Sequence, residues 1–380
     1  MFAENNQVSV KQFERMFLIE IFGTFSLTMP ALLTRNAGYY GIYPLIFGSL
    51  LAGLYLLFLL LVRKKMKGNV IYFEKSFGTF GKGSIVALYW IRFLIKSAYT
   101  MVLFVSLIGS TILRGQERWK ILLPMLLLCG YVAYEGIETR GRVLEMLYFV
   151  IFVPLLLTVV LSVSELSMKE WLPKGIFQWN DFFSTSYLVL LTYSPMEFLL
   201  FGSGHLDSVQ GKNKKEPKET MEKAAGKGFL RASFFHVLIF LVTIGLFGVT
   251  LTKDSLWSAL TIMETAKLPA DFISRLDILL IAFWIFSLFG VASGYSTYGM
   301  WLVKDRWKRG KKGVLLFFFL LCSGVLALLM PDIEKTTTFY FKYLALIDFP
   351  IAVLVPFVSL LLNNRHKTSG RQQNSDTVNG

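Results

Sequence analysis

The chain reads GIYPLIFGSLLAGLYLLFLLLV from residue 41 to residue 62, and Arg63, Lys64 and Lys65 follow at once. A run of about 20 apolar residues is long enough to cross the hydrocarbon core of a bilayer, about 30 Å thick, as an α-helix. The run lacks the period-two alternation of membrane β-strands. This stretch therefore predicts a membrane-spanning helix with a basic group at one end.

Further apolar blocks of this kind run through the chain of 380 residues. Apolar residues make up 54% of it and charged residues only 17%, against about 25% in a typical soluble domain. We therefore predict an all-α integral membrane protein with about ten transmembrane helices, at residues 11–34, 41–62, 82–111, 121–135, 143–163, 184–204, 228–250, 273–301, 313–330 and 341–362. The predicted organisation is an N-terminal cytoplasmic tail (1–10), a transporter-like membrane domain (11–363) and a polar, unstructured C-terminal tail (364–380).

Lys and Arg are concentrated in every second gap between the apolar blocks. Loops that are rich in these residues stay on the cytoplasmic side of a membrane, so both termini are predicted to be cytoplasmic. The formal net charge of +14 is explained by this topology and by contact with the anionic headgroups of the lipid bilayer. Binding to nucleic acid is therefore not expected.

Ten helices in this orientation divide into two sets of five with inverted topology, which is the plan of many secondary transporters. Gly23 and Pro30 interrupt the first helix of one set, and Ser194 and Pro195 interrupt the first helix of the other. Helix breakers in corresponding positions predict a five-plus-five inverted repeat with discontinuous helices 1 and 6 around a binding site at the midplane. The alternative is an ordinary kink in each helix.

An amino acid bound at such a site needs three kinds of partner. Its carboxylate needs exposed backbone N–H groups, its ammonium needs freed carbonyls or a carboxylate, and its side chain needs an apolar or aromatic wall. The predicted ligand-binding residues, in that order, are Gly23, Thr24 and Phe25, then Thr192, Tyr193, Ser194, Pro195 and Glu197, and finally Tyr99, Tyr193 and Trp284.

Ionisable residues inside the apolar blocks are costly to bury and usually face the interior of the bundle. Arg92 and Lys96 share one helical face, and pairing with Glu20 or Glu197 would offset much of the burial cost. We favour a gating role for them; structural pairing and snorkelling to the interface are the alternatives. Asp348 is expected to be hydrogen-bonded between helices rather than to carry a coupling ion.

Glu138, Arg142 and Glu145 follow an i, i+4, i+7 spacing, which predicts an ion-pair network on one helical face that acts as a structural latch. The 2 Cys and 3 His of the chain are scattered. No convergent set for a metal, a cofactor or a nucleophile is visible, and we expect no enzymatic activity.

Two segments resemble a known family. The stretch from Tyr134 to Glu145, YEGIETRGRVLE, resembles the G-x-E-x-x-x-R-x-x-E segment of the B subunits of GerA-type spore germination receptors. Arg275, Leu276 and Asp277, followed by Trp284, resemble the R-L-D…W segment of the same family. Glu197 is similar to the family's glutamate in helix 6, although Pro195 stands where glycine is common. The resemblance covers about residues 8–363.

This resemblance implies the fold of the amino acid–polyamine–organocation transporter superfamily and structural or gating roles for Arg275 and Asp277. It also implies the inner spore membrane of an endospore-forming bacterium, and assembly with germinant receptor A and C subunits. The implied function is that of a receptor B subunit, which binds a small germinant, often an amino acid, and signals to its partners. An amino-acid permease coupled to Na⁺ or H⁺ is the alternative, because both functions need the same pocket.

Overall fold

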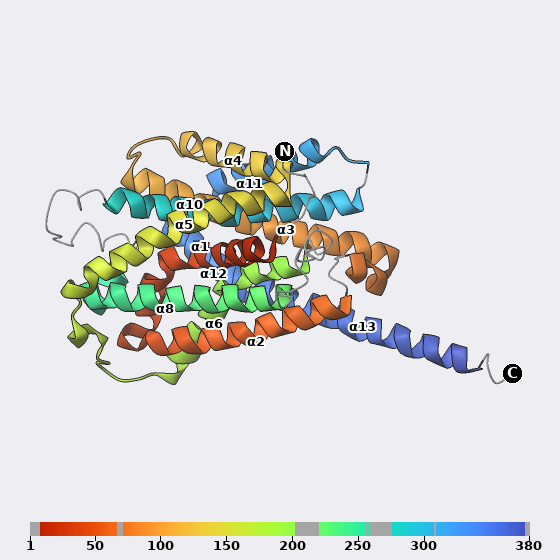
Figure 1. The fold of residues 1–380 in the computed structure, drawn as a ribbon, viewed down its shortest axis with the longest axis horizontal. Helices are drawn as coiled ribbons and strands as arrows, with labels where there is room; N and C mark the ends of the chain where they lie inside the picture. Colours follow the sequence, from red (N-terminus) through yellow and green to blue (C-terminus); the bar gives the residue numbers. More distant parts are fainter. Residues whose placement is uncertain are drawn as a thin grey trace, which may run out of the picture.

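Helices account for nearly all of the chain that the structure, a computed structural model, describes: residues 8–66, 71–201, 220–255, 257, 276–307 and 309–376. The long helices run roughly alongside one another in a bundle (Figure 1). The elements are α1 (Val10–Ala37), η1 (Gly38–Tyr40), α2 (Ile42–Met66), α3 (Ile71–Thr111), α4 (Arg118–Glu135), α5 (Ile137–Ser162), η2 (Val163–Glu165), η3 (Met168–Trp171), α6 (Trp179–Thr192), η4 (Ser194–Leu200), α8 (Met221–Asp254), α10 (Leu276–Arg306), α11 (Lys312–Leu329), α12 (Ile333–Tyr343), the π-helical segment η6 (Leu344–Asp348) and α13 (Phe349–Asp376).

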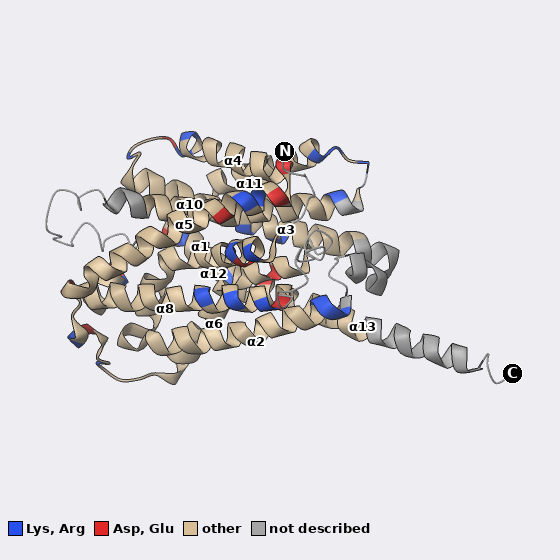
Figure 2. Cartoon of the chain, in the orientation of Figure 1, with Lys and Arg blue, Asp and Glu red and all other residues tan. Residues whose placement is uncertain are grey.

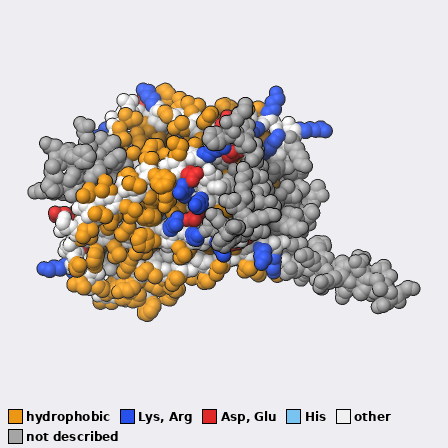
Figure 3. All heavy atoms as spheres, in the orientation of Figure 1, with side chains coloured by type: hydrophobic (Ala, Val, Ile, Leu, Met, Phe, Trp, Pro, Cys, Tyr) orange, Lys and Arg blue, Asp and Glu red, His pale blue; other side chains and the backbone are white. Residues whose placement is uncertain are grey.

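Eight helices of the described ranges are long and apolar enough to cross a membrane: α1, α2, α3, α5, α8, α10, α11 and the α12–α13 pair. The other two predicted helices correspond to α4 and to α6 with η4. Apolar side chains cover much of the described part of the face shown in Figure 3, as expected of a surface that contacts lipid tails. Lys and Arg lie mainly toward the end of the bundle where α1 and α8 begin (Figure 2).

Contacts between the two halves are reciprocal. α1 packs against α8, the second helix of the second half, and α6 packs against α2, the second helix of the first half. The third helices of the halves, α3 and α10, pack against each other. An inverted repeat of five helices, related by a two-fold axis, gives this pattern.

The sixth helix is broken where the sequence predicts it. α6 ends at Thr192, and a 3₁₀-helix begins at Ser194, with Pro195 in its first turn. Pro195 has no N–H to donate to the carbonyl of Leu191, and its ring disfavours helical geometry at Ser194. The chain therefore tightens at this point, as the hydrogen bond from the N–H of Tyr193 to the carbonyl of Leu190 (3.2 Å) shows.

The predicted break in the first helix is wrong, because α1 runs without interruption from Val10 to Ala37. Most of α1 is buried, and in such surroundings each unmade backbone hydrogen bond is costly. Pro30 lies inside the helix, and the hydroxyl of Thr34 donates to its carbonyl (2.8 Å). Gly23 is helical and lies where α10 packs closely against α1.

Other boundaries also differ from the sequence prediction: α3 begins at Ile71, not at residue 82, and α12 begins at Ile333, before the predicted start at residue 341. Gly136 has a φ of 113°, a region that favours glycine, and this single residue separates α4 from α5. α5 therefore begins at Ile137, not at residue 143, and Glu138 and Arg142 belong to its first two turns. α13 continues to Asp376, so most of the predicted unstructured tail is helical, because the helix propagates past the end of the apolar block.

Candidate functional site

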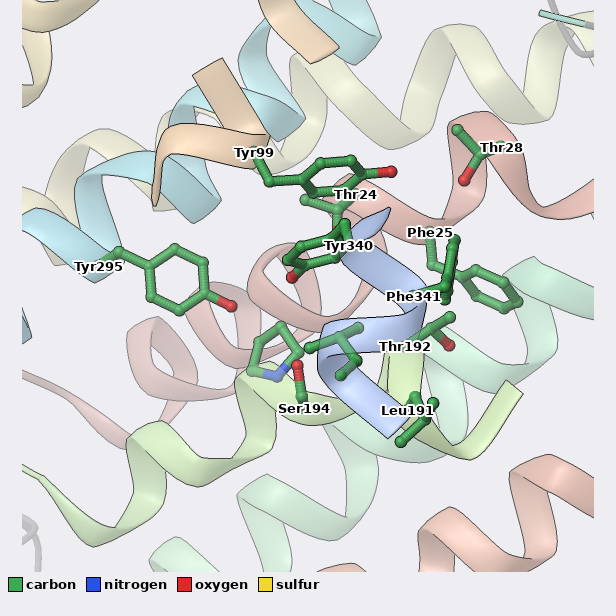
Figure 4. Close-up of a pocket in the computed structure, with 12 residues that line it drawn as sticks. Thr24, Phe25, Thr28, Tyr99, Leu191, Thr192, Ser194, Tyr295, Tyr340 and Phe341 are labelled. Atoms are coloured by element: carbon green, nitrogen blue, oxygen red, sulfur yellow. The ribbon is translucent and has the colours of Figure 1, made fainter. Parts of the chain in front are cut away.

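A small cavity lies between the broken sixth helix, α1, α3, α10 and α12. Figure 4 shows the rings of Tyr99 and Tyr340 lying one over the other beside it, with the hydroxyl of Tyr295 pointing in from α10. The centroids of the Tyr99 and Tyr340 rings are 3.7 Å apart and their planes differ by 11°. The lining residues are Thr24, Phe25, Thr28, Tyr99, Leu191, Thr192, Ser194, Pro195, Tyr295, Tyr340, Phe341 and Leu344.

Half of the residues that line the cavity were predicted from the sequence. The structure brings together six of the predicted ligand-binding residues: Thr24, Phe25, Tyr99, Thr192, Ser194 and Pro195. Tyr340 was not predicted, because it precedes the predicted start of the last helix. Thr28 could have been found, since it lies four residues after Thr24 and so on the same helical face.

Four predicted ligand-binding residues do not line the cavity. A Cβ atom on Gly23 would lie 2.6 Å from the carbonyl oxygen of Ser287, so this glycine serves a close crossing of α1 and α10. Trp284 is buried on α10, where its ring packs against that of Phe283. Tyr193 and Glu197 belong to polar clusters behind the cavity.

Tyr193 ties the break in the sixth helix to two neighbouring helices. Its hydroxyl lies 3.0 Å from the hydroxyl of Ser49 on α2 and 3.0 Å from that of Ser233 on α8. It also lies 3.2 Å from Nδ1 of His236, whose ring stacks on Phe22 of α1. These hydrogen bonds satisfy the buried hydroxyl and fix the point at which the chain changes direction.

Four buried charges form what we call the charge network: Arg92, Lys96, Glu197 and Asp348. Arg92 lies 2.8 Å from both carboxylates, through Nη2 to Glu197 and through Nε to Asp348. Nζ of Lys96 lies 2.5 Å from Glu197 and 2.8 Å from Asp348. All four side chains are at most 1% exposed, and their charges cancel. A buried cluster of this kind is tolerated only when every charge is paired.

The charge network lies next to the cavity along the same three elements. On α3, Tyr99 lines the cavity and Lys96 follows about one turn toward the start of the helix. Pro195 lines it on η4, with Glu197 two residues further along. The π-helical segment η6 begins at Leu344, in the lining, and ends at Asp348, in the network.

Glu20 does not join this network; it pairs with Arg140. Nη2 of Arg140 lies 2.6 Å from Oε1 of Glu20 and donates to the carbonyl of Gly290 (2.9 Å), and its Nε donates to Ser293 (3.2 Å). Of the two carboxylates predicted to pair with Arg92 or Lys96, Glu197 is therefore confirmed and Glu20 is not. Arg140, which sequence analysis did not select, reaches Glu20 because α5 begins six residues earlier than predicted.

The predicted latch is divided between two contacts. Arg142 pairs with Glu138 one turn earlier on α5 (2.5 Å). Glu145 instead accepts from Arg15 (2.5 Å) and Gln12 (2.9 Å), so it joins α5 to α1. Of the two remaining predicted residues, Arg275 lies outside the described residues and Asp277 lies in α10 with an undescribed side chain.

A helical bundle with a broken sixth helix and a central cavity defines a transporter-like membrane protein. Comparison with solved structures agrees with this fold. The chain superimposes on Mhp1, a nucleobase-cation-symport-1 family transporter in a closed conformation with bromovinylhydantoin bound, with a TM-score of 0.66, 10% identity, and coverage of 92% of this chain and 77% of that one. A Na⁺-coupled sialic acid symporter in a substrate-bound outward-open state gives a TM-score of 0.60, 10% identity, and coverage of 95% and 80%.

The chain belongs to the spore germination protein family named Spore_permease, whose profile matches residues 7–336. Two Bacillus subtilis (strain 168) relatives are similar to it. Spore germination protein YndE is 22% identical over 224 residues, 57% of this chain and 58% of that protein. Spore germination protein A2 is 21% identical over 246 residues, 63% and 62% respectively. The matched region thus spans less than two thirds of each relative. The protein is a germination-related, transporter-like, multi-pass membrane protein of spores.

Proposed function

We propose that this protein is the B subunit of a nutrient-germinant receptor in the inner spore membrane. It binds a small germinant, an amino acid, in the cavity beside Tyr99 and Tyr340. It then signals to receptor A and C subunits, and no catalysed reaction is involved. Membership of the spore germination family and the transporter-like fold support this proposal.

The observation that carries the proposal is the position of η6 between the cavity and the charge network. Leu344 lines the cavity at one end of this segment, and Asp348 pairs with Arg92 and Lys96 at the other. Tyr343 also donates to Asp348 (3.4 Å). π-Helical segments are rare, and many occur at functional sites. A ligand that moves Leu344 changes the ion pairs of Asp348, and so shifts the protein between two conformations.

A complementation experiment tests this function. Spores that lack the chain are complemented with the wild type, with Tyr340→Ala, or with Phe339→Ala as the matched control. Phe339 is the neighbouring aromatic residue, but it is 67% exposed and does not line the cavity. Germination is followed as the fall in optical density of the spore suspension after a nutrient is added. We expect this fall to be absent in Tyr340→Ala and present in Phe339→Ala. Unchanged germination of the deletion strain with every amino acid, sugar and nucleoside would contradict the proposal.

A permease coupled to Na⁺ or H⁺ is the second candidate, favoured by the similarity of the fold to that of two symporters. Purified protein in liposomes separates the two functions. A receptor is expected to bind a labelled amino acid without concentrating it. Accumulation of the label against its gradient, dependent on a Na⁺ or proton gradient, would establish the permease instead.

The proposed orientation places both termini in the cytoplasm, and single cysteines test it. Lys65, at the end of α2, and Lys174, between η3 and α6, are both exposed. With Cys322 replaced by serine, we expect Lys174→Cys to react with an impermeant maleimide applied from outside intact cells. Lys65→Cys is expected to react only after the membrane is permeabilised, because its loop is predicted to be cytoplasmic. The opposite labelling pattern would reverse the topology.

A further inference from the structure

The cavity offers hydroxyl groups and aromatic ring faces but no charged side chain. Among the described residues that line it there is no Asp, Glu, Lys, Arg or His. Seven of the lining residues carry hydroxyls: Thr24, Thr28, Tyr99, Thr192, Ser194, Tyr295 and Tyr340. A ligand with a net charge would lose its hydration here and find no opposite charge in this lining.

The buried charges near the cavity are already engaged. Glu197 and Asp348 each form ion pairs with both Arg92 and Lys96. A cationic ligand that recruited either carboxylate would have to break a buried ion pair and leave a cation of the protein unpaired. An anionic ligand that recruited Arg92 or Lys96 would likewise leave a carboxylate of the protein unpaired. The network therefore counts against both kinds of charged ligand.

Two hydroxyls on α1 are free to meet a ligand. Other threonines of the described helices commonly donate to the carbonyl four residues earlier. Thr34 on α1 does so, as do Thr100, Thr158, Thr243, Thr252 and Thr297 on other helices. Thr24 and Thr28 line the cavity, and their hydroxyls make no hydrogen bond to another described residue. Their i, i+4 spacing places their Cβ atoms about 5–6 Å apart on one face.

We propose that the cavity selects ligands without net charge, and that Thr28 together with Thr24 supplies the hydrogen bonds that recognise them. This inference rests on the proposed germinant-binding function. A zwitterionic amino acid with an uncharged side chain meets these conditions, because its carboxylate can accept from the two hydroxyls. Its ammonium can face the ring of Tyr99 or Tyr340, since aromatic faces attract cations. Acidic and basic amino acids would leave one charge without a partner.

Pairs of ligands with matched shapes test the ligand class. Binding to the purified full-length chain is measured by thermal shift and isotope displacement for asparagine and aspartate, glutamine and glutamate, norleucine and lysine. Glucose and glucuronate, and inosine and inosine monophosphate, extend the comparison beyond amino acids. We expect a neutral member to bind and its charged partner to bind at least about tenfold more weakly, the equivalent of one lost interaction. Equal or tighter binding of a charged partner would overturn the ligand class while leaving the receptor function intact. Absence of binding by every compound would overturn the proposed function, and this inference with it.

Thr28→Val tests the residue, because valine keeps the shape of threonine but replaces its hydroxyl with a methyl group. We expect about tenfold weaker binding of the neutral ligand with an unchanged melting temperature. Thr34→Val is the matched control on the same helix: its hydroxyl donates to Pro30 and lies outside the cavity lining, so ligand affinity should not change. Unaltered affinity in Thr28→Val, or an equal loss in Thr34→Val, would refute the role of Thr28.

Discussion

Glu197→Ala is expected to destabilise the protein by about 3–5 kcal/mol, because it leaves the buried charge network with two cations and one carboxylate. Nη2 of Arg92 and Nζ of Lys96 both lose a partner, at 2.8 Å and 2.5 Å. Neither can reach solvent, since both side chains are at most 1% exposed. Unfolding of the purified protein in detergent, followed by heat or denaturant, measures the effect.

The design includes a control and a compensating change. Glu165→Ala removes an exposed carboxylate at the end of η2 and should change the stability by less than about 0.5 kcal/mol. Combining Glu197→Gln with Lys96→Met restores neutrality around the remaining pair of Arg92 and Asp348, and should recover much of the loss. A double variant no more stable than Glu197→Ala would show that packing, not charge balance, governs this position.

Gly23→Val is expected to cost about 3 kcal/mol, through the separation of α1 from α10. The first atom of the added side chain would lie 2.6 Å from the carbonyl oxygen of Ser287 and 2.6 Å from a methyl carbon of Val291. The side chain of Val291 can rotate, but the carbonyl belongs to the backbone of a buried helix and cannot move alone. Thermal unfolding in detergent gives the loss of stability.

Gly226→Val is the matched control, because a Cβ atom on this helical glycine of α8 meets nothing within 4 Å. It should leave stability nearly unchanged, because the difference in helix propensity between valine and glycine is small compared with the cost of a clash. If Gly23→Val were as stable as the wild type but no longer responded to germinant, the packing explanation would be wrong. Gly23 would then act at the ligand, as the sequence alone suggested.

Sequence patterns were most reliable where one segment and its solvent decide the outcome. The apolar blocks predicted all-α membrane helices, and Pro195 predicted the break in the sixth helix, because both depend on local chemistry. The same local reasoning failed at Gly23, where a helix breaker lies inside an intact helix. Glycine permits an exposed backbone and a close helix crossing equally well, and only the neighbouring helix decides between them.

The candidate site shows the same division. Thr24, Phe25, Tyr99 and Ser194 were identified because they lie beside the breakers or on a polar helical face. Tyr340 was missed because it reaches the cavity from a helix far along the chain. Glu197 was one of two carboxylates predicted to pair with Arg92 or Lys96, but the sequence could not exclude Glu20 or show that Asp348 joins the pair.

The sequence by itself determined that this protein lies in a membrane, that it is all-helical, and how its Lys and Arg are distributed between the loops. Hydropathy and positive charge act on each segment separately, so each segment can be assigned without its neighbours. Only the tertiary structure decided that Asp348 joins Glu197 opposite Arg92 and Lys96 while Glu20 pairs with Arg140. An ion pair in a low-dielectric interior depends on distances of a few ångströms between helices. Those distances are set by how whole helices pack, which no single segment encodes.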